Sequence, residues 1–464
     1  MRGMQLNKTA CRGLRASSQA AASRHALASR TLTTAVLCSQ RQSRSATIPA
    51  CTTSLQLRHA SSSSSSSSSA PLGKTPLHDL HLSHGGKMVP FGGFSMPVQY
   101  TSKSIKDSHN FTRTHASIFD VSHMVQRLFI GPGAASFLQL LTPSDLSSLP
   151  VHKSTLSTLL SPSGSGGIVD DTIITRLPDR SGGAPVFYVV TNAGCREKDD
   201  KYFEEELAKW TGDKVEQEQL SAHALIALQG PDSARILEAA LSPHHPKPDL
   251  TQLYFGSSLY ARLSAAREPV LISRGGYTGE DGFEISIPDS PRAVTESLLE
   301  IGGKDIDLAG LGARDSLRLE AGMCLYGHDL DETTTPVEAG LSWIIPKSRR
   351  GKDAGYYGAE VISQQLVPKT KGGKGVDRRR VGLVVEGAPA REGAEIVSAE
   401  GEKIGTVTSG CPSPTLGKNI AMGYVADGFH KAGTEVDVVV RGKKRKAVVS
   451  KMPFVPSQYH KGAA

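Results

Sequence analysis

The sequence predicts an α+β protein that ends in a small β-barrel, and three features of the chain lead to this prediction. Between residues 75 and 345, strand-like and helix-like segments mix without the regular alternation of a doubly wound sheet. After Val381 the pattern changes to short strands and turns, which predicts a barrel or sandwich over residues 381–460. Residues 346–380 are charged and rich in glycine, which favours a linker or flexible loop between the two regions.

The first 70 residues differ in composition from the rest of the chain. They hold eight arginines, one lysine and no acidic residue, and end near the serine run 61–69. This composition is typical of a mitochondrial transit peptide followed by a polyserine linker, with an untargeted disordered tail as the alternative. We therefore expect the mature protein in the mitochondrial matrix.

Charge and cysteine usage exclude several classes of protein. The formal charge of the chain is +8, and without the nine basic residues of the first segment it is −1. A nearly neutral body gives no reason to expect a nucleic-acid partner. Cys195, Cys324 and Cys411 lie far apart, with no zinc-site spacing, so we expect no metal. We see no apolar run long enough to span a bilayer, and we expect no membrane partner.

The N-terminal region divides into recognisable elements. Apolar runs that end in a polar or glycine-containing turn read as strands, and the amphipathic stretches after them read as helices. In order, we expect strand–turn–helix at 118–142, strand–turn–helix at 186–207, strand–turn–helix at 224–241, two strands joined by a glycine-rich loop at 269–288, and a helix within 313–327.

Two aspartates stand side by side in a predicted strand, in the stretch "GSGGIVDDTIIT". Aspartate is a poor strand former, and successive side chains of a strand point to opposite faces. Asp170 and Asp171 therefore face opposite sides, and only one can easily reach solvent if both faces are covered. A charge in such a costly position suggests a functional role.

A second carboxylate in an apolar strand is Glu284, in "GGYTGEDGFEIS". The acidic residues of this loop would repel phosphate, and no Walker lysine follows the glycines. A fixed carboxylate can instead accept two parallel hydrogen bonds from an amidine-like edge, as in a pterin or guanine ring. A solvated strand face or an internal salt bridge is the alternative.

Two basic features have ordinary as well as functional interpretations. Arg314 and Arg318 lie four apart on one predicted helix, where ion pairing within the helix is the default and a substrate carboxylate is the alternative. The "RGKKRK" stretch at 441–446 is a predicted hairpin tip that is either solvated or docks an acidic partner.

Taken together, the segments resemble the aminomethyltransferase (T-protein) family of the mitochondrial glycine cleavage system. The resemblance covers nearly everything from Thr75 to the C-terminus, in family order. It rests on stretches that include "SIFDVSHM", "GGIVDDTI", "VVTNAGCREKD", "RGGYTGEDGFEIS", "LAGLGARDSLRLEAGMCLYGHDLDETTTPVEAGLSW" and "GTVTSGCPSPTLGKNIAMGYV".

The resemblance implies a three-domain cloverleaf around a central folate channel, with a C-terminal β-barrel. It also implies a reaction in which tetrahydrofolate accepts the one-carbon unit from the aminomethyl-lipoyl arm of H-protein. The products would be 5,10-methylenetetrahydrofolate, ammonia and dihydrolipoyl H-protein. The implied partners are lipoylated H-protein and, through the system, glycine decarboxylase and dihydrolipoyl dehydrogenase.

The resemblance further implies the roles of individual residues. Asp171 matches the family's essential aspartate, which would act as a general base or as an electrostatic anchor for positive charge that develops during transfer. Glu284 matches the acid that binds the pterin. The other expected folate-pocket residues are Asn192, Tyr277, Arg314, Met124, Leu128, Tyr326 and Tyr459.

Two other kinds of protein share such a folate module. Flavin-linked dehydrogenases carry a dinucleotide-binding domain before it, and residues 71–130 contain no GxGxxG motif after a strand. A non-catalytic folate-binding scaffold is the remaining alternative, and it need not keep Asp171, Asn192 and Glu284 together.

Overall fold

The computed structural model describes residues 71–462 of the chain, and these belong to one compact unit, Ser69–Ala464. The predicted transit peptide and polyserine linker, residues 1–70, lie outside the described residues. Within residues 71–462, none of the helices is both long and apolar enough to cross a lipid bilayer.

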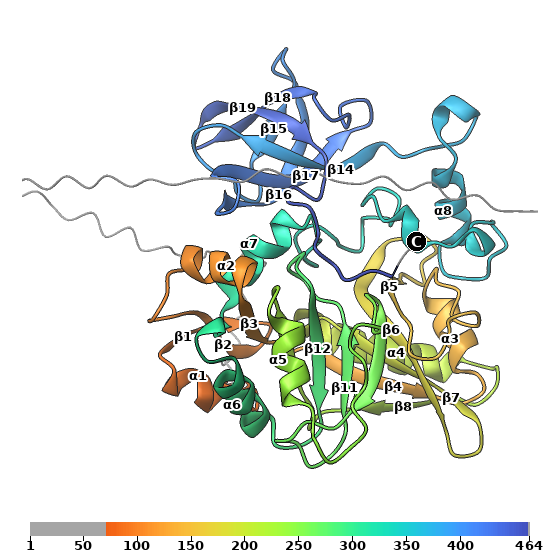
Figure 1. Ribbon diagram of the computed structural model, residues 1–464. Helices are drawn as coiled ribbons and strands as arrows, with labels where there is room; N and C mark the ends of the chain where they lie inside the picture. The colour runs from red at the N-terminus through yellow and green to blue at the C-terminus, as the bar shows by residue number, and fades with distance from the viewer. Residues whose placement is uncertain (1–70, 463–464) are drawn as a thin grey trace, which may run out of the picture. The chain divides into compact units, whose positions relative to one another are not determined.

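A six-stranded sheet forms the first layer of the N-terminal region (Figure 1). Its strand order is β10-β11-β12-β9-β3-β13, and only the β3–β13 pair is parallel. The strands are β3 (Ala116–Asp120), β9 (Ala224–Gln229), β10 (Ser257–Ala261), β11 (Val270–Arg274), β12 (Gly282–Ile287) and β13 (Ile306–Ala309).

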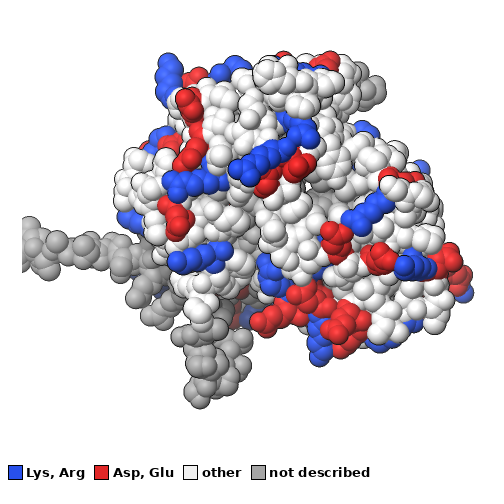
Figure 2. All heavy atoms as spheres, turned by 90° about the horizontal axis from the view of Figure 1, so that it is seen from below, with Lys and Arg blue, Asp and Glu red and all other residues white. Residues whose placement is uncertain are grey.

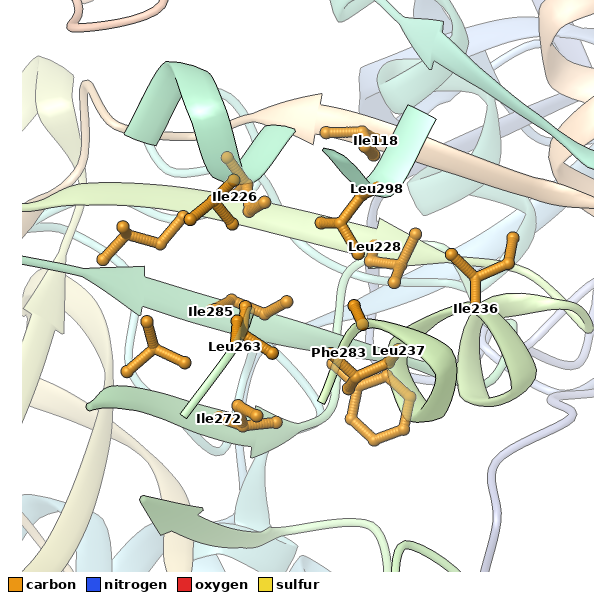
Figure 3. Close-up of a cluster of buried hydrophobic side chains, with 14 of the residues drawn as sticks. Ile118, Ile226, Leu228, Ile236, Leu237, Leu263, Ile272, Phe283, Ile285 and Leu298 are labelled. Carbon is orange, nitrogen blue, oxygen red and sulfur yellow. The ribbon is translucent and has the colours of Figure 1, made fainter. Parts of the chain in front are cut away.

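Helices α1 (His78–Ser83), α5 (Ser233–Ala240) and α6 (Pro291–Gly302) cover one face of this sheet. Alternate strand residues point into the layer between sheet and helices, as the two-residue period of a strand requires. Figure 3 shows Ile226 and Ile285 of the sheet in the same cluster as Leu237 of α5 and Leu298 of α6.

A five-stranded antiparallel sheet forms the second layer, in the order β5-β6-β7-β4-β8. Helices α3 (Ala134–Leu141) and α4 (Arg196–Lys209) pack on its outer face through Phe137, Phe203 and neighbouring apolar side chains. The strands are β4 (Val125–Ile130), β5 (Ser154–Leu160), β6 (Ile168–Arg180), β7 (Ala184–Thr191) and β8 (Glu216–Gln219).

The inner faces of the two sheets share one apolar cluster. The first sheet contributes Phe119 and Ala227, and the second contributes Leu177 and Tyr188. Each sheet therefore has helices on one face and the other sheet on the opposite face. Any polar side chain on an inner face is enclosed between two sheets, and this arrangement positions the candidate site.

Helix α7 (Leu311–Glu320) connects the sheets to the rest of the unit. It packs against α2 (Ile105–Thr114) and against β2 (Phe94–Tyr100), which pairs with β1 (Gly86–Phe91). At its N-terminus a Cβ on Gly310 would lie 2.6 Å from the Val98 carbonyl group, so the close approach of β2 requires glycine there.

Residues 346–380, expected to be a linker or flexible loop, contain helix α8 (Ala359–Leu366). Ile362 of this helix is buried in a cluster with Tyr356, Val376 and Ile168 at the start of β6. The segment therefore packs on the five-stranded sheet over part of its length. The domain limits 75–345, 346–380 and 381–460 stay a prediction.

The C-terminal region is a closed six-stranded barrel, and the predicted α+β class with a terminal barrel is confirmed. Valine and isoleucine side chains fill its interior. The strands are β14 (Arg378–Val385), β15 (Glu395–Val397), β16 (Lys403–Ser413), β17 (Lys418–Ala426), β18 (Glu435–Val440) and β19 (Lys443–Ser450).

Buried polar contacts join the barrel to α7. Arg318 donates from Nη1 to Asp329 Oδ2 over 2.7 Å and from Nη2 to Ser409 of β16 over 3.0 Å. The hydroxyl of Tyr424 on β17 donates to the backbone oxygen of Asp329 over 2.7 Å. On the face shown in Figure 2, basic and acidic side chains are interspersed, in keeping with the nearly neutral charge of the body.

Candidate active site

Strand β6 directs its two aspartates to opposite layers. Asp170 shares a face with Ile174, which belongs to the cluster under α3 and α4. Asp171 shares a face with Leu177, which belongs to the cluster between the two sheets. The sequence prediction of two opposed side chains is met by this geometry, with Asp170 buried and Asp171 half-buried.

Asn192, just after β7, bridges the two carboxylates. Its Nδ2 donates to Asp170 Oδ1 over 2.8 Å and to Asp171 Oδ1 over 2.9 Å. Its backbone N–H donates to Asp170 Oδ2 over 2.8 Å. Three hydrogen bonds thus fix the amide of Asn192 and, through it, the orientation of Asp171.

The environment of Asp171 makes it titratable near neutral pH. Burial, followed by the negative charge of Asp170, raises the pKa of Asp171 to about 7. The hydrogen bond from Asn192 and the positive charge of Arg314 act in the opposite direction. A carboxyl group with such a pKa can both accept and return a proton under physiological conditions.

Glu284 lies on the first sheet, on the side that faces the second. Its strand neighbours Phe283 and Ile285 point into the cluster under α5 and α6, so Glu284 points to the inner face. Burial raises its pKa, and the charge of Arg314 opposes this shift. Its pKa is shifted by burial and by Arg314 alone, with no hydrogen bond from the residues 71–462, which leaves both oxygens able to accept from a ligand.

A small pocket lies beside Glu284 and Arg314 of α7, and Asp171 and Asn192 are not among the residues that line it. Its lining combines apolar side chains of the inner faces with a few polar groups, which is the usual character of a small-molecule site. The residues that line it are Phe119, Val121, Ala227, Gln229, Tyr277, Thr278, Glu284 and Arg314.

Arg314 lies within electrostatic range of both carboxylates. Its positive charge opposes the upward pKa shifts of Asp171 and Glu284. Its guanidinium carbon lies 4.3 Å from the centroid of the Tyr277 ring. The Tyr277 hydroxyl donates to the backbone oxygen of Cys324. The guanidinium is thus stacked on an aromatic ring and not paired in a close salt bridge with a described carboxylate.

The remaining predicted residues fall into two groups. Met124 and Leu128 are partly buried and pack on the cluster between the sheets. Tyr326 lies beside the first residue of β6. Its hydroxyl accepts from Lys198 Nζ over 2.6 Å and donates to the backbone oxygen of Ile168 over 3.0 Å. The Tyr459 ring stacks on Phe255 with centroids 4.2 Å apart. Neither tyrosine lines the pocket, and their folate contacts stay predictions.

The structure adds two polar residues to the site that the sequence analysis missed. Gln229 lines the pocket, accepts from Thr278 Oγ1 over 2.8 Å and donates to the Gly275 oxygen over 3.0 Å. His123 is buried, and burial together with Arg314 lowers its pKa to about 4, so the ring is neutral. No chemical signal in the sequence marked either residue.

One cluster among the described residues has the geometry of a metal site. An oxygen of Asp170, an oxygen of Asp199 on α4 and the sulfur of Cys195 lie within 4.8 Å of one another, and all three residues are buried. Burial raises the pKa of Cys195, so its sulfur is a thiol at neutral pH.

Comparisons with known proteins match this chain over both of its regions. Residues 77–349 match the family model described as the GCVT N-terminal domain. Residues 378–456 match the model described as the glycine cleavage T-protein C-terminal barrel domain.

Curated relatives and a solved structure match over most of their length. A probable mitochondrial aminomethyltransferase of Schizosaccharomyces pombe is 47% identical over 393 residues, covering 85% of this chain and 95% of the relative. The mitochondrial aminomethyltransferase of Homo sapiens is 47% identical over 391 residues, covering 84% and 91%. The crystal structure of glycine cleavage system aminomethyltransferase T from Bartonella henselae matches with a TM-score of 0.74 and 38% identity, covering 84% of this chain and 99% of that one.

Proposed function

The chain belongs to the glycine cleavage T-protein family, and we propose that it is the aminomethyltransferase of a mitochondrial glycine cleavage system. It transfers the one-carbon unit from the aminomethyl-lipoyl arm of H-protein to tetrahydrofolate. The products are 5,10-methylenetetrahydrofolate, ammonia and dihydrolipoyl H-protein. The enzyme acts in the matrix, and the reaction as proposed needs no metal.

The observation that best supports this proposal is the placement of two carboxyl groups on facing sheets. Asp171 lies on the inner face of one sheet and Glu284 on the inner face of the other, with the charge of Arg314 acting on both. Such a site holds an acid–base group and a hydrogen-bond acceptor on two facing sheets, both under the influence of one guanidinium charge.

In this proposal Asp171 carries the chemistry. Its pKa of about 7 suits a group that takes the proton released when the folate amine attacks the aminomethyl carbon. In its ionised form the same carboxylate stabilises positive charge at that carbon, because few solvent dipoles compete with it between the sheets. Asn192 keeps the carboxylate oriented throughout.

Glu284 orients the folate. Its two free oxygens fit the two parallel N–H donors on the amidine-like edge of a pterin. The stacked pair of Tyr277 and Arg314 forms a wall next to it. Met124 and Leu128 supply apolar surface against the ring, and we assign further folate contacts to Tyr326 and Tyr459.

The proposed partners follow from the reaction. Lipoylated H-protein delivers the aminomethyl group, and glycine decarboxylase and dihydrolipoyl dehydrogenase act before and after this step. We propose no nucleic-acid partner and no membrane partner.

The test is an assay with purified components. The protein without residues 1–70 is mixed with aminomethylated H-protein and tetrahydrofolate, and methylenetetrahydrofolate and ammonia are measured. We expect equal amounts of both, dependent on the lipoylated carrier. Folate binding without turnover would support a non-catalytic scaffold instead and contradict the proposal.

A further inference from the structure

Asp199 is a buried acid that the mechanism above does not use. It lies in the first turn of α4, and its side chain has no exposure to solvent. Neither carboxylate oxygen has a hydrogen-bond partner among the described residues. An ionised carboxylate in this state costs several kcal/mol, because burial removes its water and nothing replaces it.

The charges around Asp199 do not remove this cost. One oxygen of Asp199 lies within 4.8 Å of an oxygen of Asp170, which is itself fully buried. The nearest buried cation is Arg127 on β4, but its Nη1 donates to Thr191 over 2.8 Å and its Nη2 pairs with Asp200. Two carboxylates this close and this dry do not both ionise at neutral pH.

The hydrogen bonds decide which of the two acids holds the proton. Asp170 accepts two N–H groups of Asn192, each over 2.8 Å, and these bonds stabilise its charged form. The charged form of Asp199 is favoured only by the neutral Thr191 hydroxyl and by the charge of Arg127. A protonated Asp199 would become a donor, and its carboxyl group lies in hydrogen-bond contact with that of Asp170, so one proton satisfies the unpartnered group.

We propose that Asp199 is a positioning residue for the transfer reaction, a neutral carboxylic acid that donates its proton to Asp170. This bond keeps Asp170 ionised, so that it accepts the two hydrogen bonds of Asn192. Asn192 in turn orients Asp171. The inference rests on the proposed role of Asp171. Burial, followed by the charge of Asp170, raises the pKa of Asp199 to about 9, in agreement with a neutral acid at physiological pH.

A metal ion is the other way to neutralise this cluster. Cys195 is a thiol at neutral pH, so only the two carboxyl groups of Asp170 and Asp199 offer good ligand atoms. A cation would need three or more ligands to displace its water. The geometry therefore favours a shared proton, and a bound metal is an outcome that the experiment detects.

Groups from every neighbouring element face this proton. Asp170 of β6 raises the pKa of Asp199, and the Thr191 hydroxyl at the end of β7 and the charge of Arg127 on β4 act in the opposite direction. Cys195, Tyr202 of α4 and Tyr326 after α7 are also near, and burial raises the pKa of all three. Above neutral pH, Asp199 is thus the first of these groups to lose a proton.

Two substitutions distinguish the hydrogen-bond donor of Asp199 from its ability to ionise. Asp199→Asn keeps an N–H donor toward Asp170 but cannot ionise, whereas Asp199→Ala removes the donor. We expect kcat of Asp199→Asn to stay within about twofold of wild type at pH 7.5 and kcat of Asp199→Ala to fall about tenfold or more. The KM for tetrahydrofolate should change by less than about twofold in both, because Asp199 does not touch the folate.

The pH profile gives a signature that a purely structural role would not produce. Wild-type kcat should fall above pH 9, as Asp199 ionises beside Asp170, and Asp199→Asn should lack this alkaline limb. Glu205→Gln, at an exposed site on the same helix, is the matched control and should keep the wild-type profile.

An infrared measurement tests the proton without any turnover. At pH 8 the wild-type protein should show a carboxylic-acid C=O band that is missing in Asp199→Asn and present in Glu205→Gln. If this band is found but the wild type makes no methylenetetrahydrofolate, the proposed function is wrong and the neutral acid stands.

Three outcomes overturn the inference itself. The first is an absent band, which means that Asp199 is ionised. The second is an equal loss of kcat in Asp199→Asn and Asp199→Ala, which means that a donor at position 199 does not support transfer. The third is a stoichiometric metal ion in the wild-type protein that is missing from the Asp199→Asn variant. This result would mean that a cation, and not a proton, neutralises the cluster.

Discussion

Asp170 and Asp171 show how adjacent residues of one type acquire different chemistry. Asp170 is enclosed under α3 and α4 and held by Asn192. Asp171 faces the space between the sheets and has a pKa near 7. The alternation of a strand separates them, and it could be predicted from the sequence because it needs only local geometry. The pKa depends on distant charges and could not.

Removing the acid–base group should abolish transfer and leave the fold intact. We expect Asp171→Asn to lower kcat by about 100-fold or more, since general acid–base catalysis contributes 10²–10⁴-fold. The amide keeps the shape and can still contact Asn192. Single-turnover formation of methylenetetrahydrofolate measures the effect, with circular dichroism as the control for folding. Turnover near the wild-type rate would refute the assignment.

The same substitution should change how stability depends on pH. The folded protein holds the Asp171 proton more tightly than the unfolded chain, because the pKa rises from 3.8 to about 7 on folding. Folded wild type therefore loses stability as pH rises from about 4 to 7, by about 1.4 kcal/mol for each unit of the shift.

Asp171→Asn lacks this titration. We expect the variant to be more stable than wild type at pH 8 by a few kcal/mol and equal to it near pH 4. Urea unfolding at the two pH values measures the difference. An equal difference at both pH values would mean that the Asp171 pKa is not raised.

Glu284 should govern folate affinity and not carrier affinity. Glu284→Gln replaces one acceptor oxygen with a donor, which cannot pair with the second N–H of the pterin edge. We expect tetrahydrofolate to bind about 10–100-fold more weakly, the range for a lost charge-assisted hydrogen bond of 1.5–3 kcal/mol. Calorimetry measures folate binding, and the KM for H-protein is the control. Unchanged folate affinity would count against the role of Glu284.

At the level of elements, helix α7 serves both the site and the barrel. It directs Arg314 to the pocket and Arg318 to Asp329 and the barrel. The sequence placed the two arginines on one helix, and pairing within the helix was the default expectation. Arg318 does pair with Asp315, three residues away, but its second partner is the distant Asp329. That partner is fixed by the packing of the barrel, which a local pattern does not encode.

Breaking the pair of Arg318 with Asp329 should strongly destabilise the protein. Both side chains are buried, so Asp329→Ala leaves an uncompensated guanidinium in the interior, and we expect a loss of about 3–5 kcal/mol. Asp315→Ala removes the exposed partner of the same arginine and should cost less than about 1 kcal/mol. Urea denaturation compares the two, and similar losses would contradict this explanation.

At the level of the whole molecule, the barrel presents its basic hairpin, residues 441–446, to solvent. Lys443 and Lys444 are exposed, at the turn between β18 and β19. No residue of this hairpin lines the candidate pocket. We predict that it docks an acidic surface of H-protein.

Reversing these charges should then weaken carrier binding only. We expect Lys443→Glu with Lys444→Glu to raise the KM for H-protein several-fold at low salt and to leave kcat unchanged. Lys304→Glu, at an exposed site in the N-terminal region, is the control. An unchanged KM, or the same increase in the control, would show that H-protein docks elsewhere.

The sequence by itself determined what depends on neighbours along the chain. Strand periods, turn residues and the change of pattern after Val381 predicted the fold class, and the costly positions of Asp171 and Glu284 marked them as candidates. Both residues lie within residues 77–349, which match the family model of the GCVT N-terminal domain.

Only the tertiary structure brought Asp171 and Glu284 to facing sheets, placed the charge of Arg314 near both, and set Asp199 beside Asp170. These relations join segments that are distant in sequence. They arise when two sheets and a helix bury their apolar faces together, and the resulting low-dielectric space decides which acids keep their protons.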